Sequence, residues 1–522
     1  MDGAIDENCD EKVKIINREC EYDVSKKLIC SKVPYFRNMF NSGLKESKQN
    51  VVKLDFNEIA FDSFINWILS DFLTIKMDMV IFLNEMADYL MMRGYISSYC
   101  HEFFHCNFNA DYLPDVLPQV TKVSKLIKSE TVDNFICRYF LLIANTNSFL
   151  KYPVEAVEAI LKLDLMIYSE YQIFESIMKW VNHKKDSRLQ TLPHLLSYVR
   201  WCFIDSVDLS KIKDNEYIKN LLNFGSIISS SGESKFDRSN QKFFITFIDI
   251  IDGEIPKVRI HLYNDKMYSL PIGDFTQNDD ISLEFVYGDR TSDILFDSGT
   301  KGIRIDWINH TFRWLDSEFL ISTYYGDIGR LIIKFQINLS EFSCFLDENA
   351  TELPNPISNE YLLLESNGKI ILIGKTRREK KLFGIFPVLN HEWFQGFRKR
   401  KHSFHATVLD NVVYILTKDL EFIEFNYETR SYNKSEPFKY DCAFEFDSVY
   451  LTSHQTKDDM IILVDKTSEI GRIHVYCTKR SKWTYNYADI SNDEFDFTAF
   501  TAAFLSLKNI KPAFGHKFFP TQ

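Results

Sequence analysis

The chain has 522 residues, of which 45% are apolar and 26% are charged, the composition of a folded globular protein. At about 150 residues per domain, this length predicts about three domains. The 61 Lys and Arg residues are outnumbered by 73 Asp and Glu, so the net charge is -12 and broad binding to nucleic acid or to anionic membranes is disfavoured. No apolar run reaches the about 18 residues of a membrane span, and the acidic N-terminus is unlike a secretory signal. We therefore expect a soluble cytoplasmic protein, with the nucleus as a second location.

The ten cysteines are scattered, and none of them forms a CxxC pair. This pattern is typical of free thiols in a reducing compartment. Glycine is scarce, at 18 residues, and neither GxGxxG nor GxxxxGK[ST] occurs, so the sequence offers no loop that would cradle a phosphate. No cofactor is predicted.

Up to about residue 225 the apolar residues mostly recur at helical spacing. Ile173, Phe174 and Ile177, for example, fall on one stripe, in the i, i+3, i+4 pattern of an amphipathic helix over 171–181. Ser169, just before this stripe, is a suitable N-cap. The same spacing predicts further helices, and only two strands are predicted in this half. The helices are 80–92, 132–144 and 154–161, and the strands are 12–16 and 51–54.

Residues 226–241 are polar and rich in serine, which predicts a linker. Beyond it the apolar period becomes two, which indicates an all-β region without helices between the strands. Strands are predicted over 257–262, 330–337, 412–416, 421–427 and 472–476.

A faint repeat accompanies these strands, because four times an aromatic residue follows a polar turn. These aromatics, Trp314, Trp393, Tyr432 and Trp483, are 79, 39 and 51 residues apart. If one further blade lies in the first interval, the period is about 40–50 residues, as in β-propellers, and about 280 residues hold about six blades. A propeller is therefore predicted in preference to a sandwich.

Two series of residues in the first half occur in the order of a known pair of domains. The first series is Cys9-Asp10, 28–40 with its Pro34-Tyr35-Phe36, 43–47, 51–54, Ala87-Asp88 and 100–104. The second series is 147–150, Asp164-Leu165, Ser169-Glu170, Phe174, Trp180-Val181, Arg188 and 195–200. In these residues the chain resembles a BTB domain followed by a BACK domain, as in the kelch-like protein family.

The resemblance implies a multidomain α+β protein with three folded parts. A BTB domain of the α/β type and an all-α BACK domain, which includes the helices following the BTB domain, would precede an all-β kelch-like propeller with degenerate repeats. The expected bounds are 1–10 for an N-terminal tail, 11–106 for BTB, 107–225 for BACK, 226–241 for the linker and 242–522 for the propeller.

In the kelch-like family, the loop after the Tyr-Phe helix meets cullin-3. The residues at that position in this chain are Leu44, Lys45 and Glu46. Leu44 would fill an apolar pocket and Glu46 would accept hydrogen bonds from the partner, as small buried anchors do. The alternative is that these residues form an ordinary polar loop.

The resemblance therefore implies a non-enzymatic substrate-recognition adaptor of a cullin-3 ubiquitin ligase. The BTB domain would recruit cullin-3, the propeller would bind a protein substrate, and catalysis would belong to the recruited enzyme. A homodimer through the BTB domain is a further implied interaction.

A second interpretation is a scaffold or cytoskeleton-binding protein that has the same domains but assembles no ligase. It is favoured by the absence of the Gly-Gly doublet that follows a blade strand in the family. Residues 369–375 retain one glycine and residues 413–417 retain none.

A third interpretation comes from His101-Glu-Phe-Phe-His105, a formal HExxH motif. In a zinc metalloprotease, the two imidazoles would bind Zn²⁺ and Glu102 would act as the general base. The motif falls where the last helix of a BTB domain is expected, however, with Phe103 and Phe104 as its packing face. We therefore predict no catalytic residues and no metal site, and keep His101 and His105 as the candidate ligands of the alternative.

Overall fold

The computed structural model describes most of the chain between residues 11 and 510. Within this range the segments left out are 43–48, 222–223, 231–235, 251–254, 264–268, 287–289, 298, 317–319, 321–360, 367–368, 376–381, 387–388, 394–403, 430, 436, 439–445, 455–459, 466–471 and 487–496. The chain forms two compact units, 1–134 and 135–522, which are considered separately here. No described helix combines the length and the apolar character that crossing a membrane requires.

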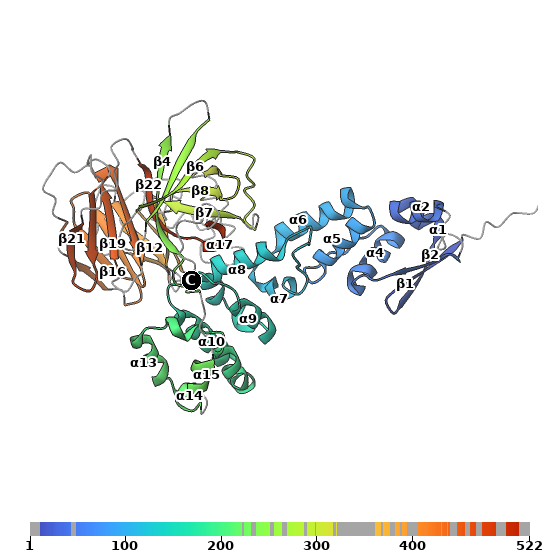
Figure 1. The fold of residues 1–522 in the computed structure, drawn as a ribbon, viewed down its shortest axis with the longest axis horizontal. Coiled ribbons are helices and arrows are strands. Elements are labelled where there is room, and N and C mark those ends of the chain that lie inside the picture. Colours follow the sequence, from blue (N-terminus) through green and yellow to red (C-terminus); the bar gives the residue numbers. More distant parts are fainter. Residues whose placement is uncertain are drawn as a thin grey trace, which may run out of the picture. The chain divides into compact units, whose positions relative to one another are not determined.

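The first unit begins with a small three-stranded sheet (Figure 1). β1 (Lys12–Asn17) pairs antiparallel with β2 (Cys20–Ser25) and parallel with β3 (Val51–Leu54), so the order is β2-β1-β3. The predicted strands in this half are therefore present, but β2 was not predicted. Only Val24 in β2 is buried, so this strand carries little apolar alternation.

Helices make up the rest of the first unit. They are α1 (Lys26–Lys32), α2 (Pro34–Asn41), α4 (Glu58–Ser70), α5 (Val80–Tyr89), the π-helical η1 (Arg93–Ser97), α6 (Ser98–Asn107), the 3-10 helix η2 (Ala110–Tyr112), α7 (Leu113–Val116) and the start of α8 (Ser129–Ala144).

The buried Gln119 holds the segment after α7 against the start of α5. Its Nε2 donates to the carbonyl oxygens of Met77 and Asp115, both at 2.7 Å. Its Oε1 accepts a 3.2 Å hydrogen bond from the backbone N–H of Ile81. The helices after α6 are thus fixed to the first domain by a fully satisfied buried amide.

The second unit opens with a helical part, and its longest complete helix is the one that the sequence predicts most clearly. Ile173, Phe174 and Ile177 of α10 are buried, and Ser169 caps the helix by accepting a hydrogen bond from the N–H of Tyr171 at 3.1 Å. The described helices after α8 are η3 (Phe149–Lys151), α9 (Val154–Leu161), α10 (Glu170–His183), α11 (Lys185–Arg188), η4 (Leu189–Thr191), α12 (Leu192–Leu196), η5 (Trp201–Phe203), α13 (Ser206–Asp214), α14 (Glu216–Lys219) and α15 (Phe224–Ser230).

The described remainder of the second unit consists mainly of sheets, whose strands pair antiparallel except at one point. The strands are β4 (Lys242–Ile250), β5 (Lys257–Tyr263), β6 (Ser269–Gln277), β7 (Thr291–Phe296), β8 (Lys301–Asp306), β9 (Thr311–Leu315), β10 (Tyr361–Ser366), β11 (Lys369–Lys375), β12 (Leu382–Phe386), β13 (Leu389–Trp393), β14 (Phe404–Leu409), β15 (Val412–Thr417), β16 (Phe422–Asn426), β17 (Ser431–Lys434), β18 (Val449–His454), β19 (Met460–Asp465), β20 (Arg472–Cys477), β21 (Lys482–Asn486) and β22 (Phe497–Phe504). A 3-10 turn, η10 (Phe446–Ser448), and a short helix, α17 (Leu507–Ile510), complete the described elements.

These strands form successive blade-like sheets. β10 to β13, β14 to β17 and β18 to β21 are three four-stranded sheets in chain order. A seven-stranded sheet joins β22-β4-β5-β6 to β9-β8-β7 through a short parallel pairing between β6 and β9. Residues 321–360 and the predicted strand 330–337 lie outside the described residues, so the count of about six blades stays a prediction.

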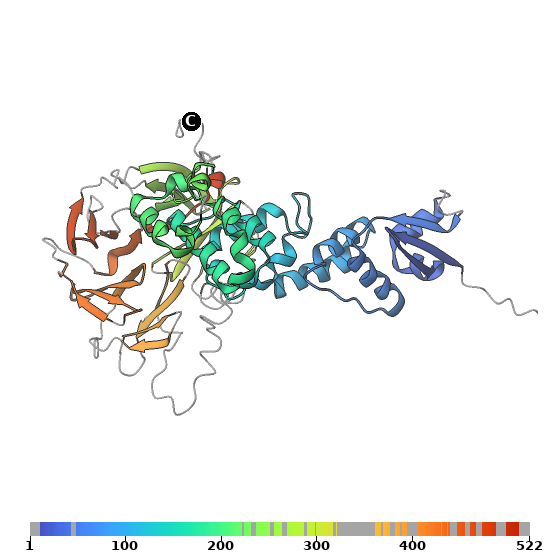
Figure 2. The ribbon, with the colours of Figure 1, turned by 90° about the horizontal axis from the view of Figure 1, so that it is seen from below.

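The sheets are arranged around a common centre (Figure 2), and the first strand of each sheet contacts the first strand of a neighbouring sheet. β22 contacts β7 and β18, and β14 contacts β10 and β18. Apolar cores fill the spaces between adjacent sheets, and the last strand, β22, pairs with the first, β4. The described β region is thus a nearly closed ring of small sheets, which has the form of a propeller.

Two buried side chains fix the start of the β region to the helices. Arg238 and Glu170 form an ion pair in which both side chains are 0% exposed, with an Nη2–Oε2 distance of 2.7 Å. Gln241 donates to the carbonyl oxygen of Leu165 at 3.0 Å. Residues 238–241, at the end of the Ser-rich segment, are therefore firmly packed.

Candidate functional site

The site predicted from the resemblance, Leu44, Lys45 and Glu46, lies outside the described residues, but the residues before and after the segment 43–48 are described. α2 leads into the loop, and it is anchored by the buried Phe36 and Met39. Arg37 ties α2 to the preceding helix, since its guanidinium donates to the carbonyl oxygens of Cys30 and Ser31 at 2.9 and 2.8 Å. α2 is therefore well anchored up to the point where the described residues stop.

An exposed cluster of apolar side chains lies beside this helix. Tyr89 and Met91 are 53% and 57% exposed, and the rings of Tyr35 and Tyr89 are 5.2 Å apart between centroids. Asn38 of α2 donates to the sulfur of Met91 at 3.7 Å. We call Tyr35, Asn38, Tyr89 and Met91 the α2–α5 patch. Exposed aromatic and methionine side chains of this kind are typical of protein-binding surfaces.

The α2–α5 patch was not recognised in the sequence. The pattern predicts one helix over 80–92, whereas α5 ends at Tyr89 and Met91 adopts a positive φ of 61°. This turn brings Met91 to Asn38, 53 positions earlier in the chain. No local spacing encodes that contact.

His101 and His105 lie on α6, as the HExxH spacing predicts. Their ring centroids are 4.3 Å apart, and the side chains of His101 and Glu102 are exposed. Phe104 is fully buried and stacks on Phe108 with a centroid distance of 4.9 Å. Of the predicted packing face, Phe104 is buried and Phe103 is half-buried, and Cys100 is the other buried residue of the helix.

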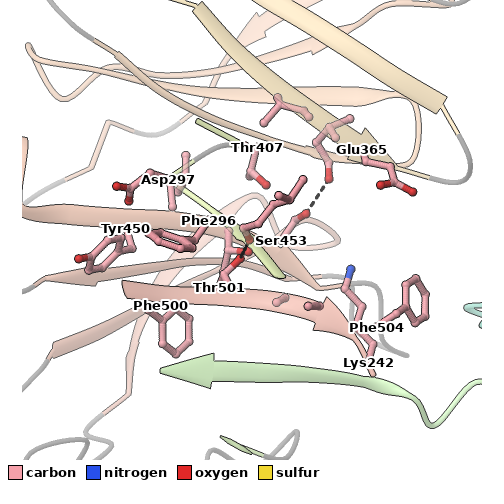
Figure 3. Close-up of a pocket in the computed structure, with 18 of the residues that line it drawn as sticks. Lys242, Phe296, Asp297, Glu365, Thr407, Tyr450, Ser453, Phe500, Thr501 and Phe504 are labelled. Atoms are coloured by element: carbon pink, nitrogen blue, oxygen red, sulfur yellow. Dashed lines mark hydrogen bonds between the residues drawn. The ribbon is translucent and has the colours of Figure 1, made fainter. Parts of the chain in front are cut away.

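A second candidate site is a cavity of about 190 Å³ at the centre of the β region (Figure 3). The first strands of the sheets, β7, β10, β14, β18 and β22, form its wall, and Arg138, Tyr139 and Tyr168 from the helical part also line it. We call this cavity the central channel. Ser453 donates to the carbonyl oxygen of Val408 at 2.6 Å, and Thr501 donates to that of Leu295 at 2.9 Å. These bonds hold neighbouring first strands together.

An arginine-bound carboxylate lies on the wall of the central channel. Asp293 receives two hydrogen bonds from Arg304, at 2.7 and 2.9 Å, and Arg138 donates to its backbone carbonyl at 2.7 Å. Burial alone would raise the pKa of Asp293, but Arg304 and Arg138 hold it below its usual value. The Asp293 carboxylate is therefore ionised, and both of its oxygens accept hydrogen bonds from Arg304. Arg138 attaches α8 to β7 through the Asp293 carbonyl.

Comparison with known protein families assigns the first half of the chain. A model described as "BTB/POZ domain" matches residues 5–107, and one described as "BACK: BTB And C-terminal Kelch" matches residues 119–213. Together with the ring of sheets, these matches give the chain the domain order of the BTB–BACK–kelch proteins. The resemblance seen in the sequence and the predicted fold class are thereby confirmed.

The similar curated proteins are kelch-like proteins. Human Kelch-like protein 26 is 27% identical over 199 residues, which are 38% of this chain and 32% of the relative. Kelch-like protein 26 of Danio rerio is 27% identical over 190 residues, or 36% of this chain and 31% of its own length. Human Kelch-like protein 6 is 26% identical over 196 residues, with coverages of 36% and 31%. The chain therefore matches about a third of the length of these relatives.

Among solved structures, the BTB domain of human gigaxonin aligns with 18% of this chain and 76% of its own, at 20% identity and a TM-score of 0.16. The BTB assignment accordingly rests on the family model and on the sequence relatives.

Proposed function

We propose that this protein is a substrate-recognition adaptor of a cullin-3 ubiquitin ligase. The observation that carries the proposal is the α2–α5 patch, an exposed apolar surface next to the helix that leads into Leu44, Lys45 and Glu46. In this proposal the loop and the patch form one surface for cullin-3. The propeller binds a protein substrate, and the recruited enzyme supplies the chemistry.

The segment fixed by Gln119 supports the same proposal. Helices that follow a BTB domain extend a partner surface only if they are held in a defined position. The buried amide of Gln119, which donates two hydrogen bonds and accepts one, supplies that position. We propose a cytoplasmic location for the complex, which imaging of a fluorescent fusion would test.

Binding of purified cullin-3 to the full chain tests the proposal. Leu44→Asp combined with Glu46→Ala is expected to abolish binding, because it removes an apolar anchor and a charge-assisted hydrogen bond. Tyr89→Ala is expected to weaken binding by about 30-fold, since truncating an interface anchor costs about 2 kcal/mol. Thermal unfolding is expected to change little in either variant, because the altered groups are exposed or lie in a loop.

Glu102→Ala is a matched control on the exposed face of α6, and it is expected to bind cullin-3 like the wild type. If the wild type does not bind cullin-3, the proposal fails and the scaffold interpretation replaces it. If the double variant still binds, the interface lies elsewhere. Stoichiometric zinc in the purified protein would instead favour the metalloprotease interpretation.

A further inference from the structure

The central channel contains two opposite charges that the described side chains do not neutralise. The first is Lys242, at the start of β4. Its Nζ lies 3.3 Å from the hydroxyl of Tyr168, and 4.6 and 5.7 Å from the ring centroids of Tyr168 and Phe504. No carboxylate in the described part of the chain is within ion-pair distance of this amine. Aromatic rings partly stabilise an ammonium group, but they leave its hydrogen-bond donors available.

The second charge is Glu365 on β10, which faces the same cavity (Figure 3). No hydrogen bond joins its carboxylate to another described residue. Lys242 and Arg138 act on it only over a longer distance, and surrounding protein raises its pKa. Glu365 is an exposed residue that lines the channel.

The other charged residues of the wall are already paired. Asp293 is bound to Arg304, and Asp297 forms an ion pair with Lys301 at 2.6 Å. Asp410 lies within electrostatic range of Lys242 but does not line the cavity. One positive and one negative group therefore remain on the wall of the same cavity, where each can attract an opposite charge on a ligand.

We propose that the central channel binds a small zwitterion of the free amino acid class. Its carboxylate would be held by Lys242, and its ammonium group would be held by Glu365. A simple anion or a simple cation would satisfy only one of these two groups, whereas a zwitterion satisfies both. The volume of about 190 Å³ is below the about 300–1,000 Å³ of pockets for larger ligands, so it suits a molecule of this size.

The walls of the channel fit this class of ligand. Thr407 and Thr452 line the cavity, and Tyr168 and Phe504 provide aromatic surface beside Lys242. Because Arg138, Tyr139 and Tyr168 come from the helical part, the ligand would contact both parts of the second unit. The inference does not depend on cullin-3 binding.

The proposal can be tested by thermal unfolding of the full chain in the presence of each of the twenty common L-amino acids. A concentration of about 10 mM detects ligands that bind with millimolar dissociation constants. At least one amino acid is expected to raise the midpoint by about 1 °C or more. Its N-acetyl derivative, which has only the carboxylate, and its amide, which has only the ammonium group, are expected to leave the midpoint unchanged.

Lys242→Met and Glu365→Gln are each expected to abolish the shift, whereas Lys242→Arg retains the charge and is expected to keep it. Glu155→Gln on α9 and Lys162→Met, directly after α9, change exposed side chains and are expected to behave as the wild type. If Lys242→Met does not fold, Glu365→Gln and Lys242→Arg still decide the result. The proposal is overturned if no amino acid shifts the wild type, or if the shift survives in Glu365→Gln.

Discussion

Arg238 joins several separate segments of the second unit through hydrogen bonds. Besides its ion pair with Glu170, its guanidinium donates to the carbonyl oxygens of Leu161 and Tyr198, both at 3.0 Å. Glu170 in turn accepts a hydrogen bond from the backbone N–H of Arg200 at 3.1 Å. Every strong donor and acceptor of this buried pair is therefore used, which is the condition under which a buried ion pair is tolerated.

Arg238→Met is expected to lower the free energy of unfolding by about 3–5 kcal/mol, because it leaves the Glu170 carboxylate buried without a counter-charge. Urea denaturation of the full chain would measure the loss. Adding Glu170→Gln to this variant is expected to restore part of the stability. If Arg238→Met unfolds like the wild type, the pair is solvated in solution and the packing at residues 238–241 is looser than described.

Lys242 gives the protein a pH-dependent stability. Burial lowers the pKa of Lys242 to about 8 from its usual value of 10.5, and Glu365 and Asp410 oppose this effect. Between these two values the unfolded state binds more protons than the folded state, so the stability contributed by this group rises with pH. Below about pH 8 both states carry the proton and the contribution is constant.

The free energy of unfolding of the wild type, minus that of Lys242→Met, is therefore expected to increase from about pH 8 to about pH 10.5. Denaturant titrations of both proteins at several pH values would measure this difference, in which the other titrating groups cancel. If this difference in the free energy of unfolding does not change between about pH 8 and about pH 10.5, the amine is as well hydrated in the folded state as in the unfolded state.

The cysteines are expected to differ strongly in reactivity. All those that the structure describes are free; Cys106 and Cys202 are exposed, whereas Cys100 and Cys137 are buried. Burial raises the pKa of Cys100 to about 12, so its thiolate is scarce at neutral pH. Timed alkylation with mass spectrometry is expected to modify Cys106 and Cys202 first, and Cys100 only on unfolding. Ten thiols are expected after denaturation without reductant. A lower number would indicate a disulfide.

At the level of elements, the missing Gly-Gly doublets do not prevent the sheets from forming. Asp297, His310, Asp410 and Ser481 adopt positive φ values between 48° and 51° in the described turns between strands. Asp in particular tolerates this conformation because its side chain can bond locally. Glycine is retained where space requires it: a Cβ on Gly302 would lie 2.9 Å from a methyl carbon of Leu295.

Periodicity predicted many elements because each carries its own apolar pattern. β3 and its predicted range 51–54 coincide, and the stripe on α10 is buried as expected. β2 was missed because only one of its residues is buried, so its sequence does not alternate between apolar and polar residues. The resemblance located the BTB and BACK domains through short motifs that the family shares.

Neither described surface could be found from the sequence in this way. The central channel combines residues from 138 to 504 in the chain, and each first strand contributes only a few of them. Lys242 and Glu365 become notable only when the ring of sheets places them at one cavity. The α2–α5 patch likewise depends on a backbone turn at Met91 that no apolar period encodes.

At the level of the whole molecule, β22 completes the ring. It pairs with β4 over Phe497–Phe504, and it contributes the buried Ala499 and Phe500 to two different cores. Leu505 and Ile510, just after it, are fully buried in one of these cores. The end of the described chain thus supports the sheets on both sides of the closure.

A chain that ends at residue 490 is expected to lose about 5 kcal/mol or more, because burial of each large apolar side chain contributes about 1.5–3 kcal/mol and the edge of β4 is left unpaired. Loss of a cooperative unfolding transition, or aggregation in light scattering, would report this change. A chain that ends at residue 510 keeps β22 and α17 and is expected to unfold like the wild type. Equal stability of both truncated chains would show that closure through β22 is unimportant.

Closure by the last strand has a consequence for synthesis. β4 leaves the ribosome about 250 residues before β22, which at about 5–20 residues per second is an interval of roughly ten seconds or more. Throughout this time the nascent chain presents an unpaired strand edge and half-covered apolar surfaces, a state that favours aggregation. We therefore expect the yield of folded protein to depend on chaperones that bind during translation, and to respond more to their supply than to the stability of the finished ring.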